Sequence, residues 1–519
     1  MSIPKFANER TTDFSRAANR RKQQDALHAV RAAFANEYPI VIGGERIATA
    51  EKLRSTNPSR PSEVVGTFQR GTPELANRAM AVAVETFERW RTVPAARRAA
   101  YLFKAARVMR RKRFHLNAVE ILEVGKSWAE ADADVAEAID FLEFYGREML
   151  RYGEDHPVVK NPGEKGKLVY LPLGVGVVIP PWNFPLAILA GMTSAAVVAG
   201  NTVVLKPSSD SPLTGWQFMQ IMEEVGLPPG VINFVSGPGG AVGDTLVSHP
   251  KTRFVSFTGS KEVGIHINET AAKVQPGQIW LKRVVAEMGG KDSIIVDEGV
   301  SLDEAAAGVV VSAFGFQGQK CSACSRAIVH ERIYDRFVDL LAQKAEGITV
   351  GDAADPGNYM GPVINRAAEE SILSFIDRAI AEGGRLVAGG TKPPGEGYLI
   401  RPTVIADVLP RATIAQTEIF GPVLAVIKAR NFEEAMEIAN NTEYGLTGAV
   451  YSRNRKRLET AEREFFVGNL YLNRKCTGAL VGVHPFGGFN MSGTDSKAGG
   501  RDYLLLFLQA KSIAEKPLT

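Results

Sequence analysis

Short apolar runs alternate with longer, helix-like stretches through the middle of the chain. The runs have the length of strands, and the stretches between them have the length of helices. The runs occupy residues 174–179, 202–205, 231–235, 254–257 and 284–286, and the helical stretches residues 186–199, 214–225, 240–248 and 261–273. This alternation predicts a parallel, doubly wound sheet. Ligands of such sheets bind beyond the carboxyl ends of the strands.

The alternation begins again near residue 293, which predicts a second α/β domain. Strands are expected at residues 293–296, 327–330, 446–450 and 469–473, and helices at residues 302–316 and 334–344. The chain has 519 residues, more than one hydrophobic core usually organises, so two or more domains are expected.

The first 150 residues show mostly helical spacing, and we expect them to cover a sheet. A helix or tether is expected before residue 35, and a hairpin at residues 38–47. Helices are expected at residues 73–91 and 95–111. A third helix is expected to present one apolar face, formed by Val135, Ile139, Leu142, Tyr145 and Met149. Residues 153–172 combine glycine, proline and charge with a short apolar run. We expect this segment to pair with the apolar segment at residues 503–514.

The composition narrows the classes of function. A net charge of +4, with basic residues spread along the chain, does not favour nucleic-acid binding, and the basic cluster at residues 107–113 has the spacing of a solvated helix face. The uncharged stretch at residues 168–205 is interrupted by prolines and glycines, so we interpret it as a strand, a loop and a buried helix rather than a membrane span. The polar N-terminus does not resemble a secretory signal, and a cytoplasmic protein is expected.

The three cysteines, Cys321, Cys324 and Cys476, are too few for a disulfide scaffold and fit a reducing compartment. Cys321 follows Lys320 within a segment rich in glycine and glutamine, and a nearby cation can lower the pKa of a thiol into the working range. Cys321 is therefore a candidate nucleophile, with a buried structural cysteine as the alternative. A zinc site that included Cys324 would need further ligands among scattered histidines, so we interpret Cys324 as structural and expect no metal.

The turns beyond the predicted strands carry a lysine, hydroxyls and glycines, which suit an anionic diphosphate. They lie at residues 181–185, 206–209, 237–240 and 258–260. The glycines after residue 236 do not complete the G-x-G-x-x-G pattern, because Val242 occupies its third position. Alone, they are a weak signal.

Seven motifs in order give the pattern its specificity. They lie at residues 181–185, 206–209, 257–260, 287–291, 318–321, 418–423 and 485–488. Together they resemble the aldehyde dehydrogenase superfamily, from about residue 40 to the C-terminus. The resemblance implies an α/β fold with a doubly wound, dinucleotide-binding domain at residues 1–152 and 173–288 and a catalytic domain at residues 289–498. It also implies a small oligomerisation β element at residues 153–172 and 499–519, and a homodimer or a multiple of dimers.

The resemblance implies a role for three catalytic residues. Cys321 would attack the aldehyde to form a thiohemiacetal, whose oxyanion would bind the Asn183 side-chain amide and the Cys321 backbone N–H. After hydride transfer to nicotinamide, Glu287 would activate the water that hydrolyses the thioester. A surface carboxylate is the alternative for Glu287, but the preceding apolar run and the two glycines that follow favour it less. Taken without the other motifs, Asn183 is equally compatible with a turn residue.

The resemblance also implies the cofactor site. Lys206 and Glu418 would hold the two riboses, Trp182 and Ser260 the pyrophosphate, and Phe420 would border the nicotinamide. The remaining cofactor contacts implied by the motifs are Pro181, Gly239 and Gly259. Ser209 stands where many NAD-preferring members carry glutamate, and a serine does not repel a 2′-phosphate. NAD is therefore expected, and the use of NADP stays open.

Residues 473–482, 278–283 and 492–500 resemble the 1-pyrroline-5-carboxylate dehydrogenase branch, which oxidises L-glutamate γ-semialdehyde in the second step of proline degradation. This resemblance implies a functional link to proline dehydrogenase. The expected substrate-binding residues are Phe184, Lys320, Ser322, Gly478, Ala479 and Phe486. Gly478 and Ala479 leave backbone N–H groups open to a carboxylate, while Ser322 could add a donor and Lys320 a charge. Another small aldehyde, a coenzyme-A-acylating reaction and a non-catalytic binding protein are the alternatives.

Overall fold

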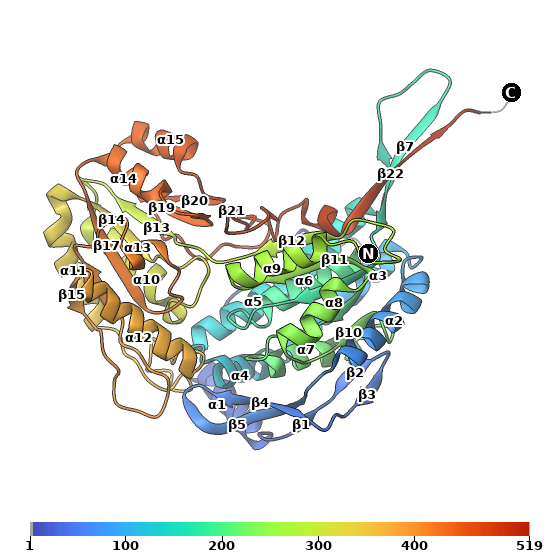
Figure 1. Cartoon of the computed structure of the whole chain (residues 1–519), viewed down its shortest axis with the longest axis horizontal. Helices are drawn as coiled ribbons and strands as arrows, with labels where there is room; N and C mark the ends of the chain where they lie inside the picture. Colours follow the sequence, from blue (N-terminus) through green and yellow to red (C-terminus); the bar gives the residue numbers. More distant parts are fainter. Residues whose placement is uncertain (1–3, 518–519) are drawn as a thin grey trace.

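The computed structural model describes residues 4–517, which form two lobes and a projecting β-arm (Figure 1). A seven-stranded sheet organises each lobe. The strands of the first sheet are β2 (Ile40–Ile42), β3 (Glu45–Ile47), β8 (Val175–Ile179), β9 (Thr202–Leu205), β10 (Ile232–Phe234), β11 (Thr252–Thr258) and β12 (Arg283–Glu287). Their order is β12-β11-β8-β9-β10-β2-β3. The five strands from β8 to β12 run parallel, which confirms the predicted alternation, and the predicted hairpin β2–β3 joins β10 antiparallel.

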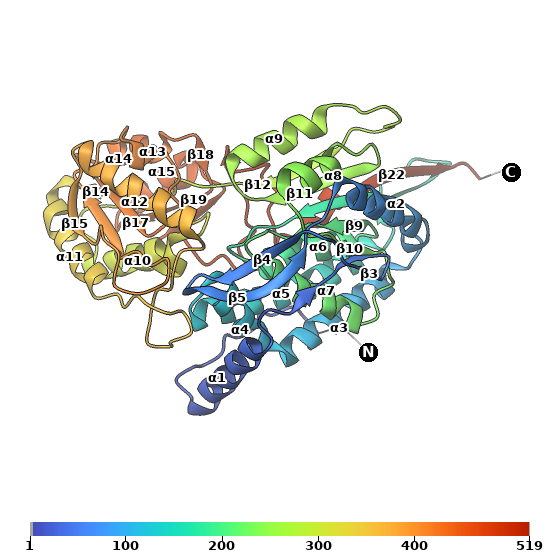
Figure 2. The same cartoon turned by 60° about the horizontal axis from the view of Figure 1, so that its bottom comes forward.

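Helices cover both faces of the first sheet (Figure 2). They are α1 (Ala17–Ala32), α2 (Pro73–Trp90), α3 (Ala95–Arg111), α4 (Arg113–Val124), α5 (Trp128–Tyr152), α6 (Ala187–Val198), α7 (Pro212–Glu224), α8 (Asp244–Ser248) and α9 (Lys261–Ala272). Neighbouring strand residues pack into different cores: Val203 contacts the core with α3, α5, α6 and α7, whereas Val204 contacts the core with α2, α8 and α9. A sheet buried on both faces explains why its strands are continuous apolar runs.

The second sheet follows the same plan. Its strands are β13 (Ser293–Val296), β14 (Arg326–His330), β15 (Arg385–Ala388), β16 (Thr403–Ala406), β17 (Val423–Ala429), β19 (Thr447–Tyr451) and β20 (Asn469–Leu472), in the order β15-β16-β17-β14-β13-β19-β20. Only β15 is antiparallel to its neighbour. The flanking helices are α10 (Leu302–Phe314), α11 (Tyr334–Glu346), α12 (Arg366–Ala381), α13 (Thr413–Gln416), α14 (Phe432–Asn440) and α15 (Arg455–Glu464). The predicted helix at residues 302–316 thus ends two residues early.

The expectation of a mostly helical N-terminal part misses a small sheet. It consists of β1 (Glu37–Tyr38), β4 (Lys52–Asn57) and β5 (Arg60–Gln69), in the order β1-β5-β4. These strands are rich in charged and hydroxyl side chains, and many of their residues stay partly exposed. A strand that is exposed on one face needs few apolar residues. These strands therefore contain no continuous apolar run by which they could be predicted from the sequence.

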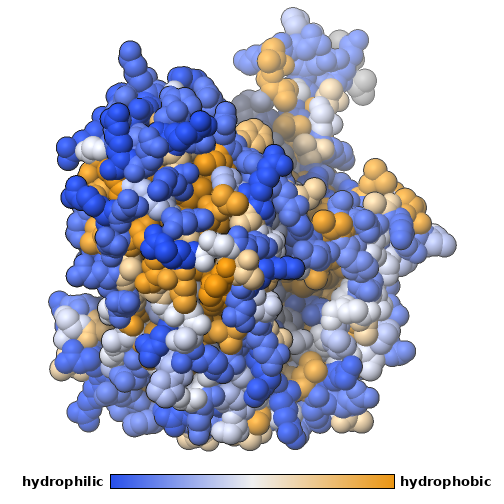
Figure 3. All heavy atoms as spheres, turned by 60° about the vertical axis from the view of Figure 1, so that its left-hand side comes forward, coloured by the Kyte–Doolittle hydropathy of each residue, from blue (hydrophilic) through white to orange (hydrophobic). Residues whose placement is uncertain are grey.

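The arm consists of β6 (His156–Pro157), β7 (Lys165–Pro172) and β22 (Leu508–Glu515). As predicted, the C-terminal segment pairs with the 153–172 segment: β22 runs antiparallel to β7 from Leu508 opposite Pro172 to Glu515 opposite Lys165. The arm projects from the first lobe and carries exposed apolar atoms among polar ones (Figure 3). Val159 is 95% exposed. Among residues 4–517, no helix combines the length and apolar character needed to cross a membrane.

Candidate active site

Cys321 lies a few residues after an unusual backbone turn at the carboxyl end of α10. Phe316 and Gln317 have left-handed φ angles of 49° and 57°, which non-glycine residues rarely adopt. The Gln317 side-chain Nε2 donates to the carbonyl oxygens of Gly125 at 3.0 Å and Pro362 at 2.8 Å. A strained turn that surrounding segments hold in place is often part of a functional site.

Asn183 reaches the same segment from the first sheet. It lies between β8 and α6, is 4% exposed, and its side-chain Nδ2 donates to the Gln319 carbonyl at 3.0 Å. The amide nitrogen carries two protons, so a second donor stays available. The structure therefore brings the Asn183 amide within two residues of Cys321, where an oxyanion on the attacked carbon would need donors.

Glu287 lies at the carboxyl end of β12, the edge strand of the first sheet. The Ser496 hydroxyl donates to its Oε1, while Oε2 is buried without a hydrogen-bond partner among residues 4–517. Its backbone carbonyl accepts from Gly259, which fixes the end of the strand. One oxygen is thus anchored, and the other can accept a proton from a bound molecule.

Electrostatics couple this carboxyl group to the cysteine. Burial raises the pKa of Glu287 to about 8, although the Ser496 hydroxyl and Lys497 oppose the shift. Burial, followed by the Asp292, Glu418 and Glu287 carboxylates, raises the pKa of the Cys321 thiol well above its ordinary value. The thiol is therefore neutral at rest. Glu287 is mostly ionised, and so able to act as a base, only at mildly alkaline pH.

A buried lysine lies beneath the turns that carry Asn183 and Cys321. Lys126 is fully buried, and its Nζ lies 3.7 Å from Asp134 Oδ1 and 3.9 Å from Glu120 Oε2. The same Nζ lies 4.2 Å from the ring centre of Phe184 and 4.5 Å from that of Phe316. One ring belongs to the turn after β8 and the other to the turn after α10, so Lys126 contacts both.

Two predicted cofactor residues, Glu418 and Lys206, are buried and can still form further hydrogen bonds. Glu418 Oε1 accepts from the Gly290 N–H at 3.0 Å, and burial raises the pKa of Glu418 to about 7. A Cβ atom at Gly289 would lie 2.0 Å from Glu418 Oε2, so only glycine fits there. Lys206 is 5% exposed, and burial lowers its pKa to about 8. Among residues 4–517, its Nζ donates a hydrogen bond only to the Pro207 carbonyl, at 3.5 Å. Such groups suit the hydroxyls of a ribose.

The other predicted cofactor residues lie around the carboxyl ends of β8 to β11. The Trp182 and Phe420 rings meet edge to face with centroids 5.5 Å apart. Ser260 caps α9 by accepting from the Val263 N–H at 3.4 Å. A Cβ at Gly259 would lie 2.5 Å from the Phe257 ring. The remaining residues are the buried Pro181, the exposed Ser209 and Gly239, which has open space where a side chain would lie.

The predicted substrate residues come from three segments. Lys320 donates to both carboxylate oxygens of Glu130, at 2.9 and 2.8 Å. Its charge is therefore balanced by Glu130, and the expectation that Lys320 adds a charge to the substrate site stays a prediction. Gly478 is exposed with a φ of 78°, in the region that favours glycine. Phe184, Ala479 and Phe486 are half-buried, and Ser322 is 9% exposed.

Sequence reasoning missed Glu137, a carboxylate on α5. It makes no hydrogen bond or ion pair with another residue of the described range 4–517. Burial, followed by Asp134, raises the pKa of Glu137 to about 8, while Lys126 and Lys320 lower it in part. The signal in the sequence was its spacing of three residues from Asp134, which places both carboxylates on one face of the helix; in the structure this helix is largely buried.

The predicted CxxC pair does not form a unit of its own. Cys324 is buried and shares a hydrogen bond with Cys476, whose Sγ also lies 3.5 Å from the Ser322 carbonyl. All three cysteines are free thiols. Within residues 4–517, no three histidine, cysteine, aspartate or glutamate side chains gather to form a metal site.

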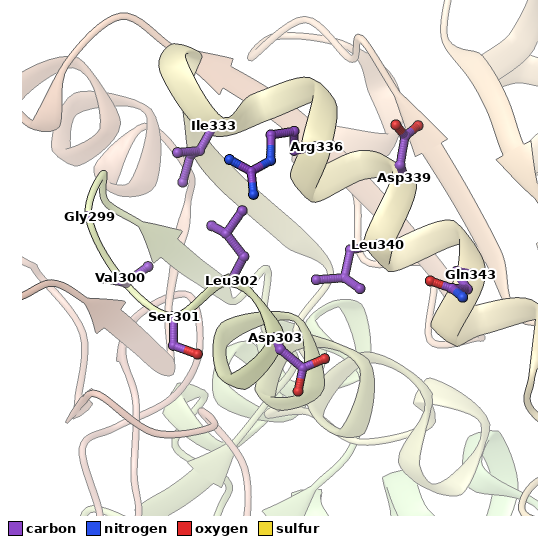
Figure 4. A pocket seen from close by; sticks show the side chains of 10 residues that line it. All are labelled: Gly299, Val300, Ser301, Leu302, Asp303, Ile333, Arg336, Asp339, Leu340 and Gln343. Carbon is purple, nitrogen blue, oxygen red and sulfur yellow. The ribbon is translucent and has the colours of Figure 1, made fainter.

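A separate groove of about 840 Å³ lies on the second lobe (Figure 4). Residues 299–303, at the amino end of α10, form one wall, and Arg336, Asp339 and Gln343 of α11 lie along the other. Cys321 follows the carboxyl end of α10, and a helix of 13 residues is about 20 Å long. The groove is therefore distinct from the site around Cys321.

Residues 46–513 match the model of the aldehyde dehydrogenase family. The chain is 56% identical to 1-pyrroline-5-carboxylate dehydrogenase of Geobacillus thermodenitrificans over 514 residues, which is 99% of either protein.

Two solved structures are similar over the whole chain. A 1-pyrroline-5-carboxylate dehydrogenase from Thermus with bound NAD is 51% identical, with a TM-score of 0.97 over 99% of this chain and 100% of that one. Proline utilization A from Bdellovibrio bacteriovorus is 47% identical, with a TM-score of 0.98 over 100% of this chain and 54% of that one. The match covers both lobes, the arm and every segment of the site. On sequence, fold and site together, the chain belongs to the aldehyde dehydrogenase family.

Proposed function

We propose that the protein is an NAD-dependent dehydrogenase that oxidises L-glutamate γ-semialdehyde, the open form of 1-pyrroline-5-carboxylate, to L-glutamate. The observation that carries the chemistry is the meeting of Cys321, Asn183 and Glu287 at the junction of the two sheets. The full-length relatives of the same name at 51–56% identity support the substrate.

The reaction begins when the Cys321 thiol gives its proton to solvent water and Sγ attacks the aldehyde carbon, whose C=O π electrons move to the oxygen. The Asn183 amide and the Cys321 backbone N–H stabilise the oxyanion of the thiohemiacetal. NAD, when bound, accepts the hydride that leaves this carbon. Glu287 then takes a proton from water through its free Oε2, and the water hydrolyses the thioester to release the acid and the thiol.

The residues of this chain fit NAD. Among the described residues, the buried Lys206 ammonium contacts no anionic group. Because Gly289 has no side chain, the Glu418 carboxylate can lie beside it. The side chains of Lys206 and Glu418 can therefore both bind ribose hydroxyls. Trp182, Ser260 and Gly239 would border the pyrophosphate. Ser209 is exposed at the turn after β9 and carries no charge, so the site does not repel a 2′-phosphate and NADP stays a second cofactor to test.

A zwitterionic substrate fits the charges near the cysteine. The Glu137 carboxylate has no partner among residues 4–517 and can bind an α-ammonium, while the Gly478 and Ala479 N–H groups can bind the α-carboxylate. Phe184, Phe486 and Ser322 would enclose the short chain between the two ends. A site of this kind discriminates by pairing, because a substrate without the charged head leaves buried groups unsatisfied.

We also propose that the arm joins two copies of the chain. β22 is an outer strand of the arm sheet, and Val158, Val159 and Leu171 expose apolar surface there. Residues 1–152 and 173–288 would then form the cofactor domain, 289–498 the catalytic domain, and 153–172 with 499–519 the oligomerisation element. A chain cut after residue 507 should lose the dimer mass in sedimentation, and a monomeric full-length chain at micromolar concentration would refute the proposal.

The protein would work with a proline-oxidising enzyme that supplies its substrate. The match to just over half of proline utilization A supports a functional link to proline dehydrogenase. Three free thiols, one of them the nucleophile, suit the reducing cytoplasm as its compartment.

The deciding experiment compares kcat/KM for glutamate semialdehyde, succinic semialdehyde and propanal, each with NAD and NADP. We expect at least a tenfold preference for glutamate semialdehyde with NAD, or about 1.4 kcal/mol. A smaller preference would refute the substrate. Cys321→Ala should remove activity and the matched Cys324→Ala should keep most of it; the opposite pattern would refute the nucleophile.

A further inference from the structure

We propose that Lys475 determines substrate specificity by pairing its ammonium with the α-carboxylate of the substrate above Gly478. The inference rests on the proposed function and adds to it a residue and a charge. Lys475 lies in the loop after β20, which connects the second sheet to the segment that contains Ser496, the residue that donates to Glu287.

Lys475 lies directly over the glycine at which the carboxylate is expected. A Cβ atom built on Gly478 would lie 3.4 Å from Lys475 Cε and 3.5 Å from Lys475 Nζ. The end of the lysine side chain therefore approaches the backbone of Gly478, which has a φ of 78° and no side chain to separate them. An anion bound at the N–H groups of this turn would lie within reach of the ammonium.

Lys475 is also a cation whose ammonium makes no polar contact with the residues that the structure describes. Neighbouring Arg474 donates to the Thr477 carbonyl at 3.0 Å and lies over the Tyr471 ring, and Lys320 is bound by Glu130. In contrast, Lys475 has no ion pair and no side-chain hydrogen bond to any residue from 4 to 517. Its ammonium is free to bind a ligand without first breaking an internal contact.

The surroundings of Lys475 favour an added negative charge. Burial lowers the pKa of Lys475, and the Lys320 and Arg474 cations lower it further, while Glu130 and Cys476 oppose the shift. The Lys320 ammonium is paired with Glu130, so a bound carboxylate would offset the charge of Lys475, which has no carboxylate partner within residues 4–517. Lys475 is exposed over part of its surface, and the burial that lowers its pKa makes this pairing stronger than one in bulk water.

The loop also fixes the distance from Lys475 to the nucleophile. The next residue, Cys476, is fully buried and its Sγ lies 3.5 Å from the Ser322 carbonyl, beside Cys321. In glutamate semialdehyde the carboxylate carbon is four bonds from the aldehyde carbon, whereas in succinic semialdehyde it is three bonds away. A cation anchored at one distance therefore selects chain length as well as charge.

The test compares Lys475→Met, which keeps the length of the side chain without the charge, with Lys475→Arg. Lys456→Met is the matched control, because Lys456 is an exposed lysine of the same lobe without an ion pair. With glutamate semialdehyde, Lys475→Met should raise KM at least tenfold and change kcat less than twofold. With propanal, which has no carboxylate, kcat/KM should stay within twofold, and Lys475→Arg should recover most of the loss.

The outcomes separate this inference from the function on which it rests. If the wild-type enzyme does not prefer glutamate semialdehyde over propanal, the proposed function fails first. If the wild-type enzyme has the preference and Lys475→Met keeps it, the inference about Lys475 alone is wrong. If Lys475→Met loses both substrates equally while its thermal unfolding is unchanged, Lys475 shapes the loop rather than binding a carboxylate, and the inference is again wrong.

Discussion

Ser496 should set the pH at which Glu287 becomes a base. Burial raises the pKa of Glu287 to about 8, so at pH 7 about one molecule in ten carries the carboxylate. The Ser496 hydroxyl donates to Glu287 Oε1 and opposes this rise. A hydrogen bond to a charged group contributes about 1.5–3 kcal/mol, which corresponds to about one to two pH units.

Ser496→Ala should therefore move the alkaline-rising limb of steady-state turnover upward by about one to two pH units. At pH 7 the hydrolysis step should slow by about 10- to 100-fold, because fewer molecules carry the ionised base. Acylation does not need Glu287 in this scheme. A burst of reduced nicotinamide should thus persist in rapid-mixing experiments and be followed by a slower steady rate.

The control is Ser301→Ala, which removes a serine from the far end of α10 and should leave the pH limb unchanged. Two results would refute the reasoning. One is a limb for Ser496→Ala that coincides with that of the wild type. The other is the loss of burst and steady rate together, which would assign Ser496 to acylation or to cofactor binding.

Three further predictions concern the cofactor, the ion pair and stability. Gly289→Ala should raise KM for NAD about tenfold with little change in thermal unfolding, because the methyl group would displace the Glu418 carboxylate; an unchanged KM would contradict this. Lys126→Met leaves Asp134 buried without its cation and should lower the free energy of unfolding by about 3–5 kcal/mol in urea titrations. For Glu287, the raised pKa means that its contribution to stability is full below pH 4.5 and is lost as the pH rises through 8. Glu287→Gln should therefore flatten the fall of unfolding free energy between these pH values, and an equally steep fall would refute the shift.

The apolar runs predicted the fold well because both sheets are covered on both faces. A strand such as β9 is then buried at every position and largely apolar, and such a run is visible without any tertiary information. In contrast, β4 and β5 face solvent on one side and contain charged and hydroxyl residues. Their positions depend on pairing with each other, which the local pattern does not contain.

The site divides in the same way. Cys321, Asn183 and Glu287 belong to motifs of contiguous residues, so the sequence alone could predict them as catalytic residues. In the structure the Asn183 side chain lies within two residues of Cys321, and the catalytic roles stay a prediction. Ser496 could not be found from sequence, because its contact with Glu287 spans 209 residues and serine is an ordinary loop residue. The balance of Lys320 by Glu130 was equally hidden, since the two residues are 190 positions apart.

The buried ion pair of Lys126 explains how two segments from different sheets keep one geometry. Asp134 accepts from the Leu186 and Ala187 N–H groups at 3.2 and 3.3 Å, which fixes the start of the helix after Asn183. Lys126 binds Asp134 and contacts one aromatic ring from each catalytic turn. Burying a charge pair costs much desolvation and adds little net stability, so stability alone does not account for it. A charge that must remain paired instead fixes the relative position of the two turns, and an oxyanion site depends on that position to within a fraction of an ångström.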